Sequence, residues 1–161
     1  MVACQNDHAE TVRMLVLDGG ADVNQPDWYG KTPCYIAAHN GHDNVVRVLH
    51  ECGGDVNQPD YDDQTPCYIA AENGHENVVR VLHDCGGNMN QANNIGFTPC
   101  WIAAENGDEN VVRVLHECGA DMNQADNDGV TPYHIAAQNG HENIVRAFIE
   151  MKINPFRPNN V

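Results

Sequence analysis

Apolar and polar positions follow one another in a fixed order within residues 60–92. A polar turn at 60–64 precedes a short run of apolar and small side chains at 67–71, and Asn73-Gly74 separates that run from residues 76–85. Valines and a leucine give this last segment a broad apolar face at helical spacing. The pattern therefore predicts a turn followed by two short helices.

Cap residues indicate where these helices begin and end. Thr65 suits the N-cap, and Pro66 suits the first helical position, where its missing N–H costs no hydrogen bond. Gly74 and Gly86 follow the two helices, and glycine readily takes the left-handed conformation that ends a helix. Two short helices cannot bury their apolar faces alone, so this unit needs a neighbour on each side.

The unit recurs every 33 residues. Thr-Pro begins at 32, 65, 98 and 131, and residues 27–59 and 60–92 are identical at 23 of 33 positions. A fixed period of this size is typical of a stacked solenoid. We therefore expect a single repeat domain over residues 1–161. Its expected parts are a partial repeat at 1–26, full repeats at 27–59, 60–92 and 93–125, a terminal repeat at 126–153 and a tail at 154–161.

Two segments carry a family resemblance. Residues 126–137 read Asp-Asn-Asp-Gly-Val-Thr-Pro-Tyr-His-Ile-Ala-Ala, and residues 119–123 read Gly-Ala-Asp-Met-Asn. They resemble the ankyrin repeat family, and the resemblance covers essentially residues 3–151. It implies an all-α repeat solenoid, an ankyrin-like stack of helix-turn-helix units with projecting β-turn fingers. It also implies a protein that binds other proteins, in a concave groove lined by the fingers and the first helices.

Some positions depart from that pattern. Asp63 stands where the other full units have a turn glycine, and aspartate tolerates a positive φ better than most residues. Residues 3–24 match only the later part of a unit, and no Gly-Ala-Asp follows the apolar run at 144–151. Polar caps normally close a solenoid. We therefore expect the chain to be a fragment of a longer array, or its ends to be buried by an associated chain.

Candidate partner-binding residues follow from the resemblance, because its finger and groove positions can be found in each unit. The differences between consecutive units concentrate in the turns, and several tips carry aromatic or apolar residues where solvent alone would favour polar ones. The alternative is that these side chains pack on neighbouring fingers. The candidates are Trp28, Tyr29, Lys31, His39, Tyr61, Asp62, Asp63, Gln64, Glu72, Asn94, Ile95, Phe97, Glu105, Asp128, Val130 and Gln138.

Charge narrows the class of partner. The formal net charge is -15, which disfavours nucleic acid and anionic membranes as partners. Residues 60–125 hold much of the acidity, and Asp60 is expected to lie along the fingers and groove with the acidic candidates above. This arrangement favours a basic or aromatic-basic protein segment. The alternative is a solvated acidic surface that only aids solubility.

The sequence gives little support for metal binding or catalysis. The recurring His-Glu-Cys and His-Asp-Cys triplets end the second helices, where neighbouring copies lie too far apart for one zinc ion, so no metal and no cofactor is expected. Serine is absent, and repetition supplies no set of distinct catalytic roles, so we expect no enzyme. No signal peptide is evident and seven cysteines cannot all pair, which favours an intracellular protein, cytoplasmic or nuclear.

A modification and two other functions remain open. The resemblance implies that Asn57, Asn90 and Asn123 stand where an asparaginyl hydroxylase modifies ankyrin repeats, whereas the structural alternative is an amide that pins its own turn. The chain could also be an architectural or self-associating scaffold whose incompletely capped ends stack. Its near-identical units also fit an engineered, consensus-like scaffold, although the irregular ends and many cysteines argue against that.

Overall fold

The computed structural model describes residues 1–154, and within them it contains ten helices and no strand. The predicted all-α repeat solenoid is therefore confirmed. The helices are α1 (Val2–Gln5), α2 (Ala9–Leu17), α3 (Pro33–His39), α4 (Asp43–Glu51), α5 (Pro66–Glu72), α6 (Glu76–Asp84), α7 (Pro99–Asn106), α8 (Glu109–Glu117), α9 (Pro132–Gln138) and α10 (Glu142–Glu150).

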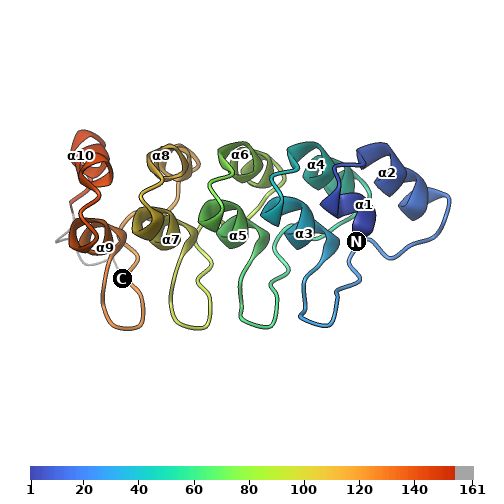
Figure 1. The fold of residues 1–161 in the computed structure, drawn as a ribbon, viewed down its shortest axis with the longest axis horizontal. Helices are drawn as coiled ribbons and strands as arrows, with labels where there is room; N and C mark the ends of the chain where they lie inside the picture. The colour runs from blue at the N-terminus through green and yellow to red at the C-terminus, as the bar shows by residue number, and fades with distance from the viewer. Residues whose placement is uncertain (155–161) are drawn as a thin grey trace.

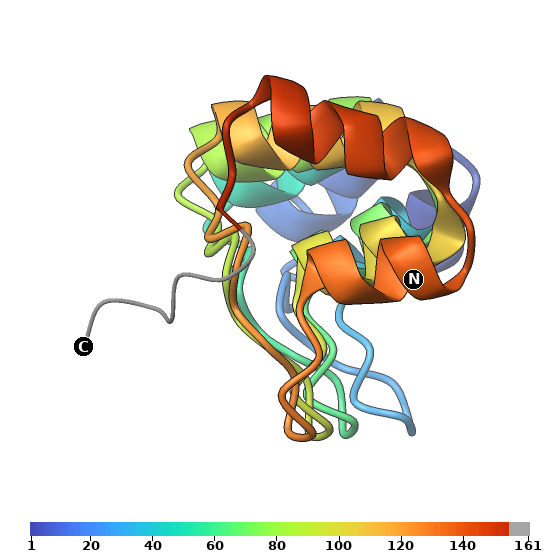
Figure 2. The same cartoon turned by 90° about the vertical axis from the view of Figure 1, so that its left-hand side faces the viewer.

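The helices form two rows that run along the stack (Figure 1). The odd-numbered helices make the inner row and the even-numbered helices make the outer row, and each helix packs on its counterpart in the next unit. Four loops project beyond the inner row and lie one behind another when the molecule is viewed from its end (Figure 2). We call their turns, residues 27–30, 60–63, 93–96 and 126–129, the fingers.

Local sequence accounts for the ends of the inner helices. The hydroxyl of Thr65 accepts a hydrogen bond from the backbone N–H of Tyr68, and Pro66 takes the first helical position of α5. Thr32, Thr98 and Thr131 cap their helices in the same way. At the other end of α5, Gly74 has a φ of 74°, so His75 can return its N–H to the carbonyl of Ala70.

The core lies between the two rows and between successive units. Ala70 and Ala71 on α5 are fully buried against Val78, Val79 and Leu82 on α6. Alanine at this point keeps the helix backbones close, while each buried valine or leucine contributes about 1.5–3 kcal/mol through removal from water. The same positions are buried in the units on either side, so the core is continuous along the stack.

Each finger is shaped by one acidic or amide side chain. The Asp60 carboxylate accepts hydrogen bonds from the backbone N–H groups of Asp62 and Gln64, both at 3.0 Å. Asp63 takes a φ of 60°, as its replacement of a glycine predicted. Successive fingers are joined by backbone bonds, such as that from the N–H of Tyr61 to the carbonyl of Tyr29 at 3.2 Å.

Asparagines near the ends of the units join one unit to the next. The amide oxygen of Asn57 accepts the backbone N–H of Asn88 at 2.6 Å, and its amide nitrogen donates to the carbonyl of Gly86 at 3.2 Å. Asn90 accepts the N–H of Asp121 at 2.6 Å in the same way. These amides therefore have a structural role, as the alternative to modification expected, although their bonds cross to the following unit.

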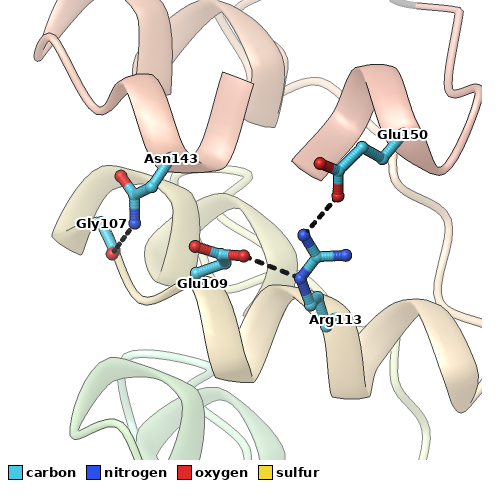
Figure 3. Close-up of polar contacts among 5 residues, drawn as sticks. All are labelled: Gly107, Glu109, Arg113, Asn143 and Glu150. Atoms are coloured by element: carbon cyan, nitrogen blue, oxygen red, sulfur yellow. Dashed lines mark hydrogen bonds and ion pairs between the residues drawn. The ribbon is translucent and has the colours of Figure 1, made fainter. Parts of the chain in front are cut away.

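Ion pairs follow the exposed side of the outer row. Arg113 on α8 donates to Glu109 one turn earlier at 2.8 Å and to Glu150 on α10 at 2.6 Å (Figure 3). The bridge from Asn143 to the carbonyl of Gly107 joins the same two units at 3.2 Å. Exposed pairs of this kind contribute roughly 0–1 kcal/mol each. They therefore set the register of the row more than its stability.

Candidate functional site

The predicted partner-binding residues are spread along the inner row and the fingers. Ten of them are exposed: Trp28, Tyr29, His39, Tyr61, Asp62, Asp63, Asn94, Ile95, Asp128 and Gln138. The other six are partly buried: Lys31, Gln64, Glu72, Phe97, Glu105 and Val130. The two groups differ in what their side chains contact, so they are treated separately.

Aromatic side chains dominate the first two fingers. Trp28 is 95% exposed and Tyr61 is 75% exposed, although both are large apolar residues. They border a hollow of about 440 Å³ between the fingers, which Gln25, Pro26 and Asp27 complete. Exposed tryptophan and tyrosine beside a hollow are typical of interaction surfaces, because these side chains bury much area and lose little conformational entropy.

Phe97 and Val130 contribute to packing within the stack. The Phe97 ring stacks on the Trp101 ring with their centroids 3.5 Å apart and an interplanar angle of 11°. The carbonyl of Val130 accepts the indole N–H of Trp101 at 3.1 Å. Both residues lie against the core rather than at a finger tip. Of the two interpretations considered for these apolar residues, packing on neighbours therefore describes Phe97 and Val130, and exposure describes Trp28, Tyr29 and Ile95.

Asp60 does not lie open along the groove as its sequence position suggested. The residue is only 6% exposed, and its carboxylate is occupied by the backbone N–H groups of its own finger. Asp126 and Asp27 do the same in other fingers. Asp60 therefore shapes its own turn. The sequence could have indicated this role, because Asp or Asn recurs at the same position of each unit.

Two carboxylates lie on neighbouring inner helices. Glu72 ends α5, and Glu105 lies at the end of α7, which packs against α5. Burial raises the pKa of Glu105, and the nearby Glu72 carboxylate raises it further. Neither carboxylate has an ion-pair partner in residues 1–154. A cation placed between them would relieve this repulsion.

Tyr68 lies beside this pair and was not predicted as a site residue. It precedes Glu72 by one helical turn, so both project from the same face of α5. Burial raises its pKa, and the charges of Glu72 and Glu105 add to the effect. In the preceding unit, the equivalent Tyr35 hydroxyl bonds to Gln64 at 3.1 Å.

The position equivalent to Gln64 is Phe97 in the next unit, which offers no acceptor. The Tyr68 hydroxyl has no hydrogen-bond partner within the described chain, and its oxygen is not fully buried, so it remains accessible at the surface. The exchange of Gln64 for Phe97 was the sequence signal for this unpaired hydroxyl.

Cations are distributed unevenly between the two rows. Arg13, Arg80 and Arg113 lie on the outer row and pair with Glu51, Glu117 and Glu150 of the following units. Among the fingers, the inner helices and the segments that join them within residues 1–154, there is one basic side chain other than histidine, Lys31. Its ammonium lies 5.2 Å from the Tyr35 ring centre and 5.9 Å from that of Tyr29. The inner acids are therefore largely left without neutralising charges.

The histidines and cysteines do not assemble into a centre. Among residues 1–154, no three His, Cys, Asp or Glu side chains are placed to hold a metal ion. All seven cysteines are free thiols, and burial raises the pKa of Cys34 to about 12. A thiol with so high a pKa stays protonated near neutral pH and is a poor nucleophile.

The three candidate modification sites are partly buried. Asn57 and Asn90 are held by the bonds to the following unit described above. The amide oxygen of Asn123 is buried and has no hydrogen-bond partner within the described chain. Hydroxylation at these positions stays a prediction.

Comparison with known proteins adds one result. A family model described as ankyrin repeats (3 copies) matches residues 1–93 and again residues 68–159. A comparison with curated proteins finds no significant match. No helix within residues 1–154 has the length and apolar character needed to cross a bilayer. Because the matched segments span nearly the whole sequence and the helix pairs and fingers recur in phase with them, the chain belongs to the ankyrin repeat family.

Proposed function

We propose that this chain binds a segment of another protein across its fingers and inner helices. Ankyrin repeats are generally protein–protein interaction modules rather than enzymes, and the same side chains at each unit supply no separate acid, base and nucleophile. The observation that carries the proposal is the pair of exposed aromatic residues, Trp28 and Tyr61, beside a hollow between the first two fingers.

The chemistry of the inner surface favours a segment with a basic residue. Glu72 and Glu105 lie without ion-pair partners in the described chain, and the unpaired hydroxyl of Tyr68 lies on the face of α5 that carries Glu72. A guanidinium group can donate hydrogen bonds to two carboxylates at once and a further one to the tyrosine oxygen. An aromatic or proline side chain of the same segment would fill the hollow beside Trp28.

The test uses two synthetic peptides of equal length, one rich in arginine and tryptophan and one in which glutamate replaces arginine. Fluorescence anisotropy with the labelled peptides should show binding of the basic peptide only, weakening as salt is raised. The double variant Glu72→Gln/Glu105→Gln should weaken binding by at least about tenfold, because charged hydrogen bonds contribute roughly 1.5–3 kcal/mol.

A matched control changes the same charge on the outer row. Glu76→Gln/Glu117→Gln removes two carboxylates from the central units but leaves the inner surface intact. If this control weakens binding as much as the inner variant does, the peptide responds only to net charge and the groove proposal fails. Equal binding of both peptides would also contradict it.

A further inference from the structure

One contact between units recurs along the stack. The imidazole Nε2 of His42 lies 3.0 Å from the carbonyl oxygen of Gln5, and that of His75 lies 3.0 Å from the carbonyl of His39. His141 repeats the contact with Glu105 at 2.8 Å. In each case, a histidine that precedes an outer helix reaches the last turn of the inner helix before it.

A glycine of the preceding unit makes room for this side chain. A Cβ added at Gly41 would lie 2.9 Å from the His75 ring, and one at Gly107 would lie 2.8 Å from the His141 ring. Gly140 holds the same position at the end of the stack, and no atom of residues 1–154 lies within 4 Å of a Cβ built there. Among the described residues, no side chain fills the place that His75 and His141 take beside Gly41 and Gly107.

Apolar side chains are also exposed on this terminal surface. Ala38, Ala71 and Ala104 are fully buried by the following unit, whereas the equivalent Ala137 is exposed. Ile149 is 64% exposed, and the equivalent residue in the other full units is a histidine. A hollow of about 450 Å³ lies here, lined by Ala137, Gly140, Glu142, Val145, Arg146 and Ile149. We call these six residues the C-terminal face.

The C-terminal face also carries a cation without a partner. Arg13, Arg80 and Arg113 each pair with a glutamate of the following outer helix at 2.6–2.7 Å. Arg47 on α4 and Arg146 on α10 are the equivalent residues, and both are exposed with no ion pair among the described residues. Arg146 therefore occupies a position from which three of the four internal arginines bind a carboxylate of the following unit.

The opposite end of the stack carries the equivalents of residues that, in internal units, contact the preceding unit. His8 precedes α2 as His42 precedes α4, and its exposed ring has no partner in the described chain. Met14 is 57% and Leu15 is 49% exposed, whereas the equivalent Val48 and Leu49 of the next outer helix are buried. Leu17 holds the position on α2 that Glu51 holds on α4, and Asp18, one residue later, is the nearest carboxylate in sequence. We call His8, Met14, Leu15 and Asp18 the N-terminal face.

We propose that the C-terminal face binds the N-terminal face of a second copy of this chain, so that copies stack head to tail. His8 of the second copy lies against Gly140 and donates to the carbonyl of Gln138. Met14 and Leu15 cover Ala137 and Val145, and Asp18 pairs with Arg146. The occupant is a second copy because its end continues the interface that already joins the units, with matching charge.

This contact uses surfaces other than the fingers and the groove, so it goes beyond the proposed binding of a partner segment. It joins two different faces, and a stack of any length keeps one free face of each kind at its two ends, so the assembly is open-ended. The net charge of -15 per copy opposes stacking. Added salt screens that repulsion and should therefore strengthen association.

The experiment is analytical ultracentrifugation of the full chain over a range of concentrations. The wild type should show a mass that rises with concentration and with salt. Ile149→Asp blocks the C-terminal face and Met14→Asp blocks the N-terminal face, and each variant alone should stay monomeric. Their mixture should form a complex of twice the monomer mass and no larger species, because one complementary pair of faces remains.

Both substituted side chains are more than half exposed, so the variants should fold, and circular dichroism with the thermal midpoint checks this. Trp28→Ala, on a finger, is the control and should associate as the wild type does. A wild type that remains monomeric throughout overturns the proposal, as does a mixture that stays monomeric. A blocked variant that still dimerises shows a symmetric contact and overturns it as well. Binding of the basic peptide by the blocked variants reports separately on the groove.

Discussion

The inner and outer rows of helices are built from the same repeat, but they differ in which side chains recur from unit to unit and which remain exposed. On the outer row, α4, α6 and α8 share the segment Val-Val-Arg-Val-Leu-His. Its arginine pairs with the next unit from α6 and α8, as the equivalent Arg13 does from α2. On the inner side, Trp28, Tyr61 and Asn94 differ from finger to finger and remain exposed. Residues that stabilise the stack are therefore repeated, whereas those available to a partner vary.

This difference has a physical origin. Each unit must present the same surface to its neighbours, because the interface between units is made again at every step of the stack. Backbone bonds, such as that from Tyr61 to Tyr29, join neighbouring finger tips, and few side-chain bonds, such as that from the Asn127 amide to the Asn94 carbonyl, add to them. Their side chains can therefore change without loss of the fold.

The largest expected effect is on the outer row. Leu82→Ala on α6 should lower the free energy of unfolding by about 2–5 kcal/mol, because Leu82 is fully buried and its removal leaves a cavity. Urea unfolding followed by circular dichroism measures it. A loss well below about 1 kcal/mol would mean that the outer helices do not carry the stability assigned to them.

An intermediate loss of stability is expected to distinguish two aromatic residues of the inner side. Phe97→Ala should cost about 1–2 kcal/mol, since it removes a stacked ring partner, whereas Trp28→Ala should stay within about 0.5 kcal/mol because its side chain is exposed. Thermal unfolding of both variants makes the comparison. Equal costs would show that the finger tips also contribute to folding, and the contrast between the rows would weaken.

The smallest effect concerns the acids of the groove. The raised pKa of Glu105 means that the folded chain holds this proton more tightly than the unfolded chain, so stability falls as pH rises through that pKa. Glu72→Gln removes the neighbouring charge that contributes to this raised pKa. The pKa of Glu105 should therefore move downward, part of the way to its ordinary value. The decline of stability with rising pH should then become smaller.

Carboxyl ¹³C shifts followed over a pH titration measure this pKa directly. Glu117→Gln on the outer row provides the comparison and should leave the pKa of Glu105 unchanged. If Glu72→Gln also leaves it unchanged, the two carboxylates do not interact across the groove.

Much of the fold could be predicted from local signals. Thr65, Pro66 and Gly74 mark the ends of α5 through backbone bonds that involve only near neighbours in sequence. The positive φ of Asp63 followed from its alignment with the turn glycines. The predicted end of the second helix at Cys85 was one residue too long, because α6 ends at Asp84 and Cys85 caps it.

The site was harder to predict, because exposure depends on contacts between units. Trp28 and Phe97 both appeared as apolar finger residues, yet one is open to solvent and the other stacks on Trp101. Asp60 appeared to be a partner contact, yet backbone N–H groups occupy its carboxylate. Neither outcome follows from hydrophobicity or charge alone.

The sequence by itself determined the repeat, the helix ends and the family, because the 33-residue period and its caps act within one unit or between identical units. The tertiary structure decided which side chains remain available. It placed the amide bonds of Asn57 across the interface between units, left the Tyr68 hydroxyl without a hydrogen-bond partner among residues 1–154, and exposed Ala137 at the end of the stack. These outcomes depend on which residue of the next unit lies opposite, and only the packing of one unit on another defines that.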